Sequence, residues 1–292
     1  MIARQNPAVK PLLKWYGGKW WLKNKLIDLM PSHSNYIEPF AGGASVLLNK
    51  YPCDFEILND SNELLIHFYT LVRDKPEFVM DALKDVEYSQ SHFDKAMSIL
   101  ANSHSLDEKA LAFFITSRMS YGGKGGWFAW TDNQKGKSGE PQEYKTWESV
   151  KSRVPIVSAR LQNVTILSKN AIYNISLWDN EDTLTYCDPP YMHATREKSS
   201  RRSYEFEMSD SEHMRLAQVL NRCRGHVIIS GFESPEYDTY YAGWQKRSWV
   251  VKNNGTLTSK SATGQSATMR EVIWSNFNIR TGKLLYDCKT KS

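Results

Sequence analysis

The segment between Asn35 and Asp60 constrains the fold more than any other part of this chain. It indicates a strand from Asn35, a tight turn at Gly42-Gly43, a helix opening near Ala44 and a second strand over 55–60. Asp60 ends the second strand about 20 residues past the turn, where a βαβ nucleotide fold carries the acid that binds ribose hydroxyls. The segment therefore predicts an α/β fold that holds a nucleoside-bearing cofactor against the turn and a helix N-terminus.

The glycine turn argues against two other nucleotide ligands. The chain has no G-x-x-x-x-G-K-[ST] motif, which disfavours a nucleoside triphosphate. The turn is also not a full G-x-G-x-x-G, which weakens the case for a dinucleotide.

A helical block interrupts the strand pattern between residues 61 and 160. Apolar residues recur there at helical spacing, and Pro76 stands just inside the start of one segment. The predicted helices cover 63–73, 77–86, 92–100, 107–119 and 145–161. Because the block is too long for one crossover between strands, we predict an inserted helical domain over 62–161, with 1–61 and 162–292 forming the sheet domain.

The remaining strands are expected after this block. They are predicted at 163–167, 184–188, 226–230, 248–252 and 271–274. Ser209 and Glu212 form an S-x-x-E capping box for a helix that ends near Arg224, and the apolar spacing over 20–30 predicts a helix that stops at Pro31.

The string Asp188-Pro189-Pro190-Tyr191 stands at the end of the predicted strand 184–188, at the edge where open α/β sheets bind ligands. Two prolines hold the backbone extended and leave carbonyl oxygens as acceptors. The Asp188 carboxylate and the Pro189 carbonyl could hold the two hydrogens of an exocyclic amine while Tyr191 stacks on its ring. Alone, such a string is more often a tight turn than a catalytic site, so its context decides.

A glycine-rich segment near the N-terminus suits a flat or anionic ligand. It places Gly17-Gly18 among Lys14, Trp15 and Lys19, and the glycines allow a sharp turn and a close approach of the backbone. The alternative is a surface turn whose tryptophans fill the core.

A second glycine-rich segment lies inside the helical block. It runs from Arg118 through Tyr121 and Lys124 to Trp130. Cations and aromatic rings interleaved on a loop are typical of a nucleic-acid surface. The alternative is a mobile hairpin with Trp127 and Trp130 packed inward.

The composition sets wider limits. A chain of 292 residues that is 41% hydrophobic can bury a full core. Its net charge of +5 and pI near 8.8 fit a polyanionic partner, with a solvated basic face as the alternative. Because no apolar run is long enough for a bilayer and no signal peptide is visible, we expect a cytoplasmic protein with no membrane partner. The four cysteines lack C-x-x-C spacing, so we expect neither a metal site nor disulfides.

Taken together, these motifs resemble the Dam-like, D-P-P-Y-containing (group alpha) family of S-adenosylmethionine-dependent DNA adenine-N6 methyltransferases. The similarity covers nearly the whole chain, in the family's order. It rests on L-K-W-x-G-G-K at 13–19, E-P-F-x-G at 38–42, the acid at Asp60, Y-C-D-P-P-Y at 186–191 and the strand at 227–230.

The resemblance implies a fold, a cofactor and a partner. The fold is the Rossmann-like class I methyltransferase mixed sheet with an inserted, mostly helical target-recognition domain. The cofactor is S-adenosyl-L-methionine, released as S-adenosyl-L-homocysteine. The partner is double-stranded DNA, bound by a monomer or weak dimer of a bacterial or phage-encoded, nucleoid-associated enzyme.

The resemblance also implies a role for each motif. The implied cofactor residues are Trp15, Lys19, Glu38, Phe40, Gly42, Asp60 and Asp188. The implied catalytic residues are Asp188, Pro189, Pro190 and Tyr191, and the implied DNA-binding residues are Lys14, Arg118, Tyr121 and Lys124. The chain departs from the family pattern at Ala44, where many relatives have glycine, and at Lys169-Asn170-Ala171, where an acidic and aromatic pair is usual.

The chemistry that the resemblance implies is methyl transfer to the 6-amino group of an adenine rotated out of the duplex. Positioning supplies most of the rate, and neither a covalent enzyme intermediate nor a metal is required. Three alternatives stay open: transfer to the 4-amino group of cytosine, an RNA substrate, and a non-catalytic DNA-binding relative. Neither the recognition sequence nor a restriction, phage or regulatory role follows from these residues.

Overall fold

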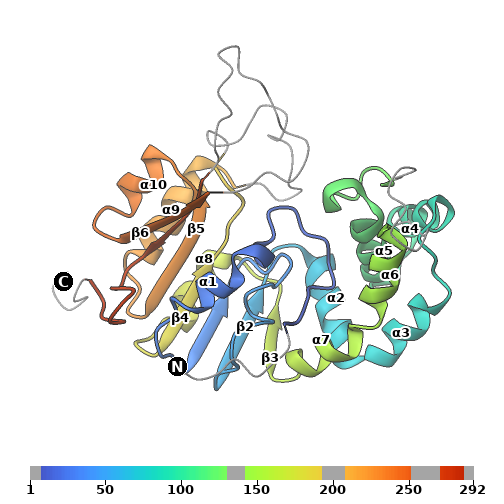
Figure 1. Ribbon diagram of the computed structural model, residues 1–292, viewed down its shortest axis with the longest axis horizontal. Coiled ribbons are helices and arrows are strands. Elements are labelled where there is room, and N and C mark those ends of the chain that lie inside the picture. The colour runs from blue at the N-terminus through green and yellow to red at the C-terminus, as the bar shows by residue number, and fades with distance from the viewer. Residues whose placement is uncertain (1–7, 130–141, 193–207, 251–269, 286–292) are drawn as a thin grey trace, which may run out of the picture. The chain divides into compact units, whose positions relative to one another are not determined.

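The computed structural model describes residues 8–129, 142–192, 208–250 and 270–285 (Figure 1). The chain forms two compact units. Unit 1 comprises Met1–Asp28 and Phe40–Asn170, and unit 2 comprises Leu29–Pro39 and Ala171–Ser292.

Unit 1 combines two parallel strands with the helices of the predicted insert. Strand β2 (Phe55–Asn59) pairs in parallel with β3 (Val164–Leu167). The helices are η1 (Lys19–Trp21), α1 (Lys23–Ile27), α2 (Glu63–Asp74), α3 (Pro76–Lys84), α4 (Gln90–Asn102), α5 (Leu106–Met119), η2 (Tyr121–Gly123), α6 (Gln142–Lys151) and α7 (Val154–Leu161). Helix α2 packs against α3, α5, α7 and β3, so it is the centre of this unit.

Buried aromatic rings hold the helices of unit 1 together. Phe68 of α2 stacks on Phe114 of α5 with ring centroids 4.5 Å apart, and Phe114 lies 5.7 Å from Trp147 of α6. The indole N–H of Trp147 donates to the carbonyl of Val86 at 2.6 Å, which satisfies its one polar atom. These contacts give the helical block a core of its own inside unit 1.

The predicted helices of the block are confirmed, with one difference. Predicted segments 63–73, 77–86, 92–100 and 107–119 correspond to α2, α3, α4 and α5. The segment 145–161 is not one helix, because the chain breaks between α6 and α7 and restarts with Pro155 in the first turn. A proline lacks the N–H that a continuous helix needs, and at a helix start that N–H is dispensable.

The helix predicted from Ala44 does not form. Ala44 has φ of 50°, in the left-handed region, and residues 45–49 form turns instead of an α-helix. The amide of Leu48 donates to Ala44 at 3.0 Å and the amide of Lys50 donates to Val46 at 2.9 Å, so two helix-like bonds occur without a continuous ladder. The helix predicted over 20–30 is also shorter, because only η1 and α1 form there.

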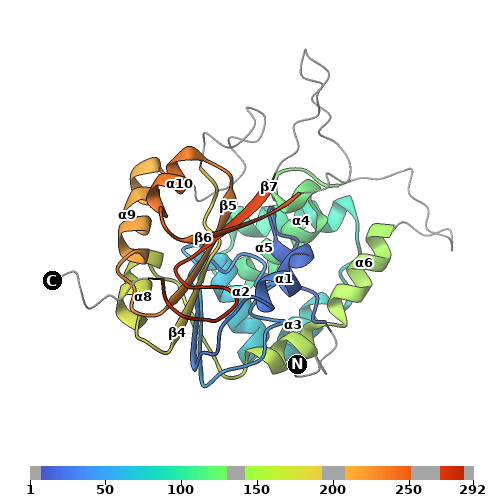
Figure 2. The ribbon, with the colours of Figure 1, turned by 60° about the vertical axis from the view of Figure 1, so that its left-hand side comes forward.

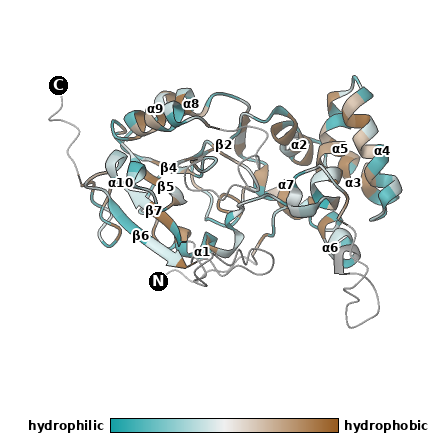
Figure 3. Ribbon diagram, turned by 90° about the horizontal axis from the view of Figure 1, so that it is seen from above, coloured by the Kyte–Doolittle hydropathy of each residue, from teal (hydrophilic) through white to brown (hydrophobic). Residues whose placement is uncertain are grey.

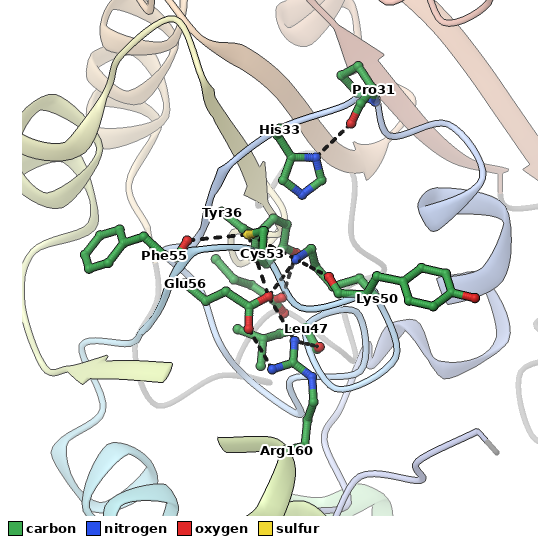
Figure 4. Close-up of polar contacts among 11 residues, drawn as sticks. Pro31, His33, Tyr36, Leu47, Lys50, Cys53, Phe55, Glu56 and Arg160 are labelled. Carbon is green, nitrogen blue, oxygen red and sulfur yellow. Dashed lines mark hydrogen bonds and ion pairs between the residues drawn. The ribbon is translucent and has the colours of Figure 1, made fainter. Parts of the chain in front are cut away.

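A buried ion cluster ties the last helix of the block to β2 (Figure 4). Glu56 of β2 accepts from Lys50 Nζ at 2.6 Å, and Arg160 of α7 donates to both Glu56 oxygens at 2.6 and 2.9 Å. Arg160 also donates to the carbonyl of Leu47 at 2.7 Å. One carboxylate therefore holds two cations, and through Arg160 it links α7 to the turns that follow Ala44.

Unit 2 carries the other strands. They are β1 (Asn35–Glu38), β4 (Thr183–Cys187), β5 (His226–Phe232), β6 (Gln245–Val250) and β7 (Arg270–Ser275), with helices α8 (Ala171–Trp178), α9 (Asp210–Leu220) and α10 (Pro235–Tyr240). Strand β4 pairs in parallel with β1 and β5, and β7 pairs antiparallel with β5 and β6. Helix α9 packs against α8 and α10, and Figure 2 shows the three helices together beside the strands.

Within the described residues, seven strands form a mixed sheet in the order β3-β2-β1-β4-β5-β7-β6. All five residues of β4 are buried, as expected for a central parallel strand covered on both faces. Strand β6 is at one edge of this order, and its residues are mainly exposed and hydrophilic (Figure 3). The predicted α/β mixed sheet is confirmed.

The local predictions for unit 2 hold with small shifts. The Ser209–Glu212 capping box is present at the start of α9, which ends at Leu220, short of the predicted Arg224. Strand β6 begins three residues before its predicted start, and β5 continues to Phe232. Helices α8 and α10 were not predicted. Each is at most eight residues long, so apolar residues have too few turns over which to show helical spacing.

The predicted domain division stays a prediction. The segment 62–161 lies wholly within unit 1, together with β2, β3 and the N-terminal segment. Among the helices of the described ranges, none is long and apolar enough to cross a membrane.

Candidate active site

Asp188 is the first residue beyond β4, and a serine from the neighbouring strand holds it. Ser230 of β5 donates through Oγ to Asp188 Oδ1 at 2.8 Å. In the parallel register Cys187 pairs with Ile229, so Asp188 and Ser230 are the next residues along the two strands. Ser230 is buried and Asp188 is half-buried, so the carboxylate stands at the edge of the sheet with one side fixed.

Tyr186 lies in β4, two residues before Asp188, and also contacts Ser230. Its hydroxyl is 3.2 Å from Ser230 Oγ. Side chains two residues apart on a strand share a face, which is why Tyr186 and Asp188 both reach Ser230. Burial raises the pKa of Tyr186 well above its usual value, and the charges of Asp188, Glu38 and Glu271 raise it further.

Tyr191, the last residue of the D-P-P-Y string, is held from β7 and from β5. Its hydroxyl donates to the buried carboxylate of Glu271. Its ring meets Phe232 edge-on with centroids 4.5 Å apart. Burial raises the pKa of Tyr191 well above its usual value, and the charge of Glu271 adds to this, so the hydroxyl stays a hydrogen-bond donor.

Glu38 ends β1 in the same unit. It is buried, and Tyr36 donates to its Oε2 at 2.8 Å. The pKa of the buried Tyr186 is therefore raised by the negative charges of three carboxylates of unit 2: Asp188, Glu38 and Glu271.

The glycine turn in unit 1 is built against Trp15. Gly42 has φ of 44°, and a Cβ at this position would lie 2.6 Å from Trp15 Nε1. The amide of Gly42 donates to Asp60 Oδ2 at 3.1 Å, and Tyr69 of α2 donates to the carbonyl of Gly42 at 3.0 Å. The turn is therefore fixed from three sides, and only glycine fits it.

Asp60 has a structural role in this turn besides its predicted one. Its Oδ1 accepts from the amide of Asn62 at 3.0 Å. Burial raises the pKa of Asp60, and the hydrogen bonds from the backbone amides of Asn62 and Gly42 oppose that rise. The backbone amides of Ser61 and Ala41 also oppose the rise, so four amides act on this one carboxylate.

The other predicted cofactor residues of unit 1 lie near the same turns. Lys19 is buried, and its Nζ donates to the carbonyl of Gly17 at 2.8 Å. Phe40 is half-buried at the start of the glycine turn. Asn59 exchanges two hydrogen bonds with the backbone of Lys169, at 3.0 and 2.9 Å, which fixes the chain just before the exposed Asn170.

Lys14 packs against the second glycine-rich segment. Its Nζ donates to the carbonyl of Ser120 at 3.1 Å, and Ser117 donates to its carbonyl at 3.0 Å. A Cβ at Gly123 would lie 2.0 Å from the carbonyl oxygen of Lys14, so the two segments touch backbone to backbone. The sequence predicted both segments separately, and the structure brings them together within unit 1.

This joined region presents aromatic rings to solvent. Tyr121 is 67% exposed and Trp127 is 83% exposed, and Lys124 Nζ lies 4.5 Å from the ring centroid of Tyr16. The alternative in which Trp127 packs inward is wrong. Trp130 lies outside the described residues.

Arg118 is more enclosed than Tyr121, another of the predicted DNA-binding residues. It is half-buried near the end of α5, and burial together with the charge of Arg153 lowers its pKa to about 10. Its Nε is buried without a hydrogen-bond partner in the structure. Arg118 is therefore less accessible to a ligand than Tyr121.

Four residues of these sites were not predicted: Ser230, Glu271, Phe232 and Tyr69. Glu271 had a weak sequence signal, because it is the one carboxylate of the predicted strand 271–274 and directly precedes the apolar run Val272-Ile273-Trp274. Ser230 and Phe232 fall at the end of a predicted strand, which marks their position but not their contacts. Tyr69 follows the apolar spacing of α2 like any core residue.

Cysteines and metal ligands play no visible part in the described regions. Cys53, Cys187 and Cys223 form no disulfide among the described residues, and Cys288 lies outside them. Across the described part of the chain, no group of three or more His, Cys, Asp or Glu side chains could hold a metal ion.

Known proteins resemble this chain over most of its length. Residues 15–253 match the D12 class N6 adenine-specific DNA methyltransferase family. A DNA adenine methylase of Serratia marcescens is 28% identical over 270 residues, which cover 88% of this chain and 95% of that protein. A DNA adenine methylase of Vibrio cholerae is 26% identical over 264 residues, covering 87% and 91%. The type II methyltransferase M.MjaIII of Methanocaldococcus jannaschii is 26% identical over 273 residues, covering 84% and 92%. The family match spans the glycine turn, the helical block and the D-P-P-Y string, and the chain therefore belongs to the D12 class of N6 adenine-specific DNA methyltransferases.

Proposed function

We propose that this adenine-specific DNA methyltransferase transfers the methyl group of S-adenosylmethionine to the 6-amino group of a flipped adenine in double-stranded DNA. The observation that carries the proposal is Asp188, held by Ser230 at the carboxyl edge of β4 and followed by two prolines and Tyr191. The family supplies the reaction class. The methyl donor, the flipped base and the residue roles are the proposed parts.

The chemistry at Asp188 follows from hydrogen-bond inventory. An adenine amine carries two hydrogens, and the Asp188 carboxylate and the Pro189 carbonyl are two acceptors on adjacent residues. Both bonds draw the nitrogen lone pair out of conjugation with the ring, which makes the nitrogen a better nucleophile. The Asp188 carboxylate can also take the proton that the nitrogen loses on methylation. Tyr191 supplies an aromatic face for the base, beside Phe232.

The residues of unit 1 fit a nucleoside cofactor. Gly42 lets the backbone lie against the flat ring of Trp15, where a Cβ would clash, and its amide holds Asp60, the acid predicted for ribose hydroxyls, at the same turn. We propose that Trp15, Lys19, Phe40, Gly42 and Asp60 of unit 1 hold S-adenosylmethionine. The sequence predicts the same role for Glu38 and Asp188, which belong to unit 2. When bound, this cofactor supplies a methyl group on a positively charged sulfur.

The carboxylates of unit 2 suit such a cationic donor. Glu38 and Glu271 are buried, and their negative charges, with that of Asp188, raise the pKa of Tyr186. Their negative charge favours a sulfonium and an ammonium group over neutral ligands. This supports S-adenosylmethionine as the donor.

We further propose that DNA binds the region formed by Lys14, Tyr16, Tyr121, Lys124 and Trp127. Two lysines offer charge for phosphates, and the exposed rings of Tyr121 and Trp127 offer faces for bases. In this proposal Arg118 contributes positive charge close to the region, since it is half-buried at the end of α5. The helical segment 62–161 is accordingly the proposed target-recognition domain, and a monomer or weak dimer acts on DNA at the nucleoid of a bacterial or phage-infected cell.

The reaction is tested by incubating the protein with methyl-labelled S-adenosylmethionine and unmethylated DNA, followed by digestion to nucleosides. We expect label in N6-methyladenine and none in cytosine. Label in cytosine, or label only when RNA replaces DNA, would overturn the proposal. No label with any nucleic acid, despite measurable cofactor binding, would favour a non-catalytic DNA-binding relative.

Gly42→Ala is expected to weaken binding of S-adenosylmethionine at least tenfold. The added Cβ meets the Trp15 ring at 2.6 Å, and a left-handed φ costs a non-glycine residue roughly 1–2 kcal/mol. Titration calorimetry measures the affinity. Gly125→Ala is the matched control, because Gly125 has φ of 73° with nothing within 4 Å of its Cβ position, so backbone strain occurs there without a clash. Equal affinities for the two variants would contradict the assignment of the turn.

Lys124→Ala is expected to weaken DNA binding several-fold with little change in cofactor affinity. Loss of one phosphate contact should lower the slope of log K against log salt by about 1. Fluorescence anisotropy at several salt concentrations measures both quantities. Lys95→Ala removes an exposed lysine of α4 outside this region and is expected to bind DNA like the parent. An equal loss of DNA and cofactor affinity in Lys124→Ala would count against the proposed surface.

A further inference from the structure

Asp188 is the end of a chain of three side chains in unit 2. Two successive hydrogen bonds link Tyr186 to Ser230 and Ser230 to Asp188. The distance is 3.2 Å between Tyr186 Oη and Ser230 Oγ and 2.8 Å between Ser230 Oγ and Asp188 Oδ1. We infer that Ser230 is a positioning residue for methyl transfer, which orients the Asp188 carboxylate toward the substrate amine and is itself oriented by Tyr186. This inference rests on the proposed role of Asp188.

Proton accounting gives the chain a direction. Ser230 has one hydroxyl proton, and its Oγ lies within reach of two acceptors, Asp188 Oδ1 at 2.8 Å and the Cys187 carbonyl at 3.2 Å. A hydrogen bond to an ionised carboxylate is shorter and stronger than one to a neutral carbonyl, so the proton points to Asp188. Tyr186 must then donate to Ser230 Oγ, because the only proton on Oγ is already used.

The surroundings of Tyr186 keep it a donor. Its side chain is buried, and the neighbouring carboxylates disfavour a phenolate. The phenol therefore stays protonated across the working pH range of an enzyme. A donor that cannot ionise fixes the Ser230 hydroxyl in one orientation, and that orientation favours one rotation of the Asp188 carboxylate.

The backbone makes this orientation rigid. Tyr186 lies in β4 and Ser230 in β5, two strands paired in parallel, and both residues are buried. Sites built on strands hold side chains more tightly than sites built on loops. Asp188 itself is outside the strand, and the bond from Ser230 ties it to the sheet.

The predicted consequence is a loss of rate without a loss of binding. A reacting group misplaced by about 1 Å can cost about a hundredfold in rate. We therefore expect Ser230→Ala to slow single-turnover methyl transfer ten- to a hundredfold, with DNA and cofactor affinities within twofold of the parent. Tyr186→Phe is expected to slow transfer less, about three- to tenfold, since Ser230 keeps its proton.

The experiment is a double-mutant cycle on the full chain, with single-turnover methyl transfer, cofactor affinity and melting temperature as readouts. The variants are Ser230→Ala, Tyr186→Phe and the double variant, with Ser230→Thr as the rescue because it keeps the hydroxyl. The matched control is Ser275→Ala. Ser275 is a buried serine of β7 whose Oγ donates to the carbonyl of Phe277 at 3.1 Å, outside this chain of bonds, so its loss should leave the rate unchanged.

Three outcomes together support the inference: Ser230→Ala is slow, Ser230→Thr recovers most of the rate, and Tyr186→Phe adds nothing in the Ser230→Ala background. A parent-like rate for Ser230→Ala, or full additivity of the two substitutions, would overturn it. A fall equal to that of Ser275→Ala would assign Ser230 a structural role and would also overturn it. Should Ser230→Ala not fold, Ser230→Cys replaces it, because the thiol fills similar space as a weak donor, with the same outcomes.

Asp188→Ala separates this inference from the function on which it rests. If Asp188→Ala transfers methyl groups like the parent, the proposed site is wrong. If Asp188→Ala is inactive while Ser230→Ala is fully active, the site stands and only the positioning role of Ser230 is lost.

Discussion

Asp188→Ala is expected to reduce single-turnover methyl transfer by at least about a thousandfold, while cofactor binding stays measurable. The substitution removes the carboxylate that accepts from the substrate amine, and no backbone group can replace it. The hydroxyl of Ser230 loses its charged partner at 2.8 Å but keeps the Cys187 carbonyl within 3.2 Å, so the fold should survive. Rapid-quench transfer assays with labelled cofactor and titration calorimetry measure the two quantities.

Two variants sharpen this prediction. Asp188→Asn keeps the shape of the side chain but loses its charge, so we expect a rate close to that of Asp188→Ala if charge matters more than space. Asp182→Ala removes an exposed carboxylate just before the other end of β4 and should behave like the parent. Parent-like transfer by Asp188→Ala would mean that the D-P-P-Y string is a turn and that the reacting amine binds elsewhere.

Glu56→Ala is expected to lower the free energy of unfolding by about 3–5 kcal/mol, because breaking a buried ion pair leaves uncompensated charge. Two ion pairs are lost here, because Lys50 and Arg160 each lie 2.6 Å from a carboxylate oxygen of Glu56 (Figure 4). Lys50 and Glu56 are buried, and the Nε of Arg160 is already without a partner in the structure. Urea unfolding followed by circular dichroism measures the change.

The charge explanation has its own controls. Asp81→Ala breaks the exposed pair between Asp81 and Lys84 on α3 and should leave the unfolding midpoint nearly unchanged. The triple variant Lys50→Met, Glu56→Leu and Arg160→Met replaces the cluster with apolar groups and should recover much of the loss. A small effect of Glu56→Ala would show that water reaches the cluster, and that α7 is held by packing alone.

Local patterns predicted the regular elements well. Apolar spacing located α2, α3, α4 and α5, because each helix buries one face against neighbours and that face recurs in the sequence. It missed the break before Pro155, where two amphipathic helices follow each other with almost no gap. It also predicted a helix after the glycine turn, where the left-handed Ala44 produces separate turns from a similar apolar run.

The partners of the site residues were beyond such patterns. Ser230 is 42 residues from Asp188 along the chain, and Glu271 is 80 residues from Tyr191. Their contacts depend on which strands are neighbours and in which register, and periodicity within one strand carries no information about either. The exposure of Trp127 was equally open, because a loop tryptophan packs inward or outward according to what the rest of the fold leaves uncovered.

The sequence by itself determined which chemical groups the site contains. They are an acid, two prolines and a tyrosine after a buried strand, and a glycine turn followed by an acid. Those groups depend on residue type and on spacing within one short segment. Only the tertiary structure decided that Ser230 bonds both Asp188 and Tyr186 and that Glu271 accepts from Tyr191. These pairings join strands β4, β5 and β7, and strand order is set by burial of the whole sheet rather than by any one segment.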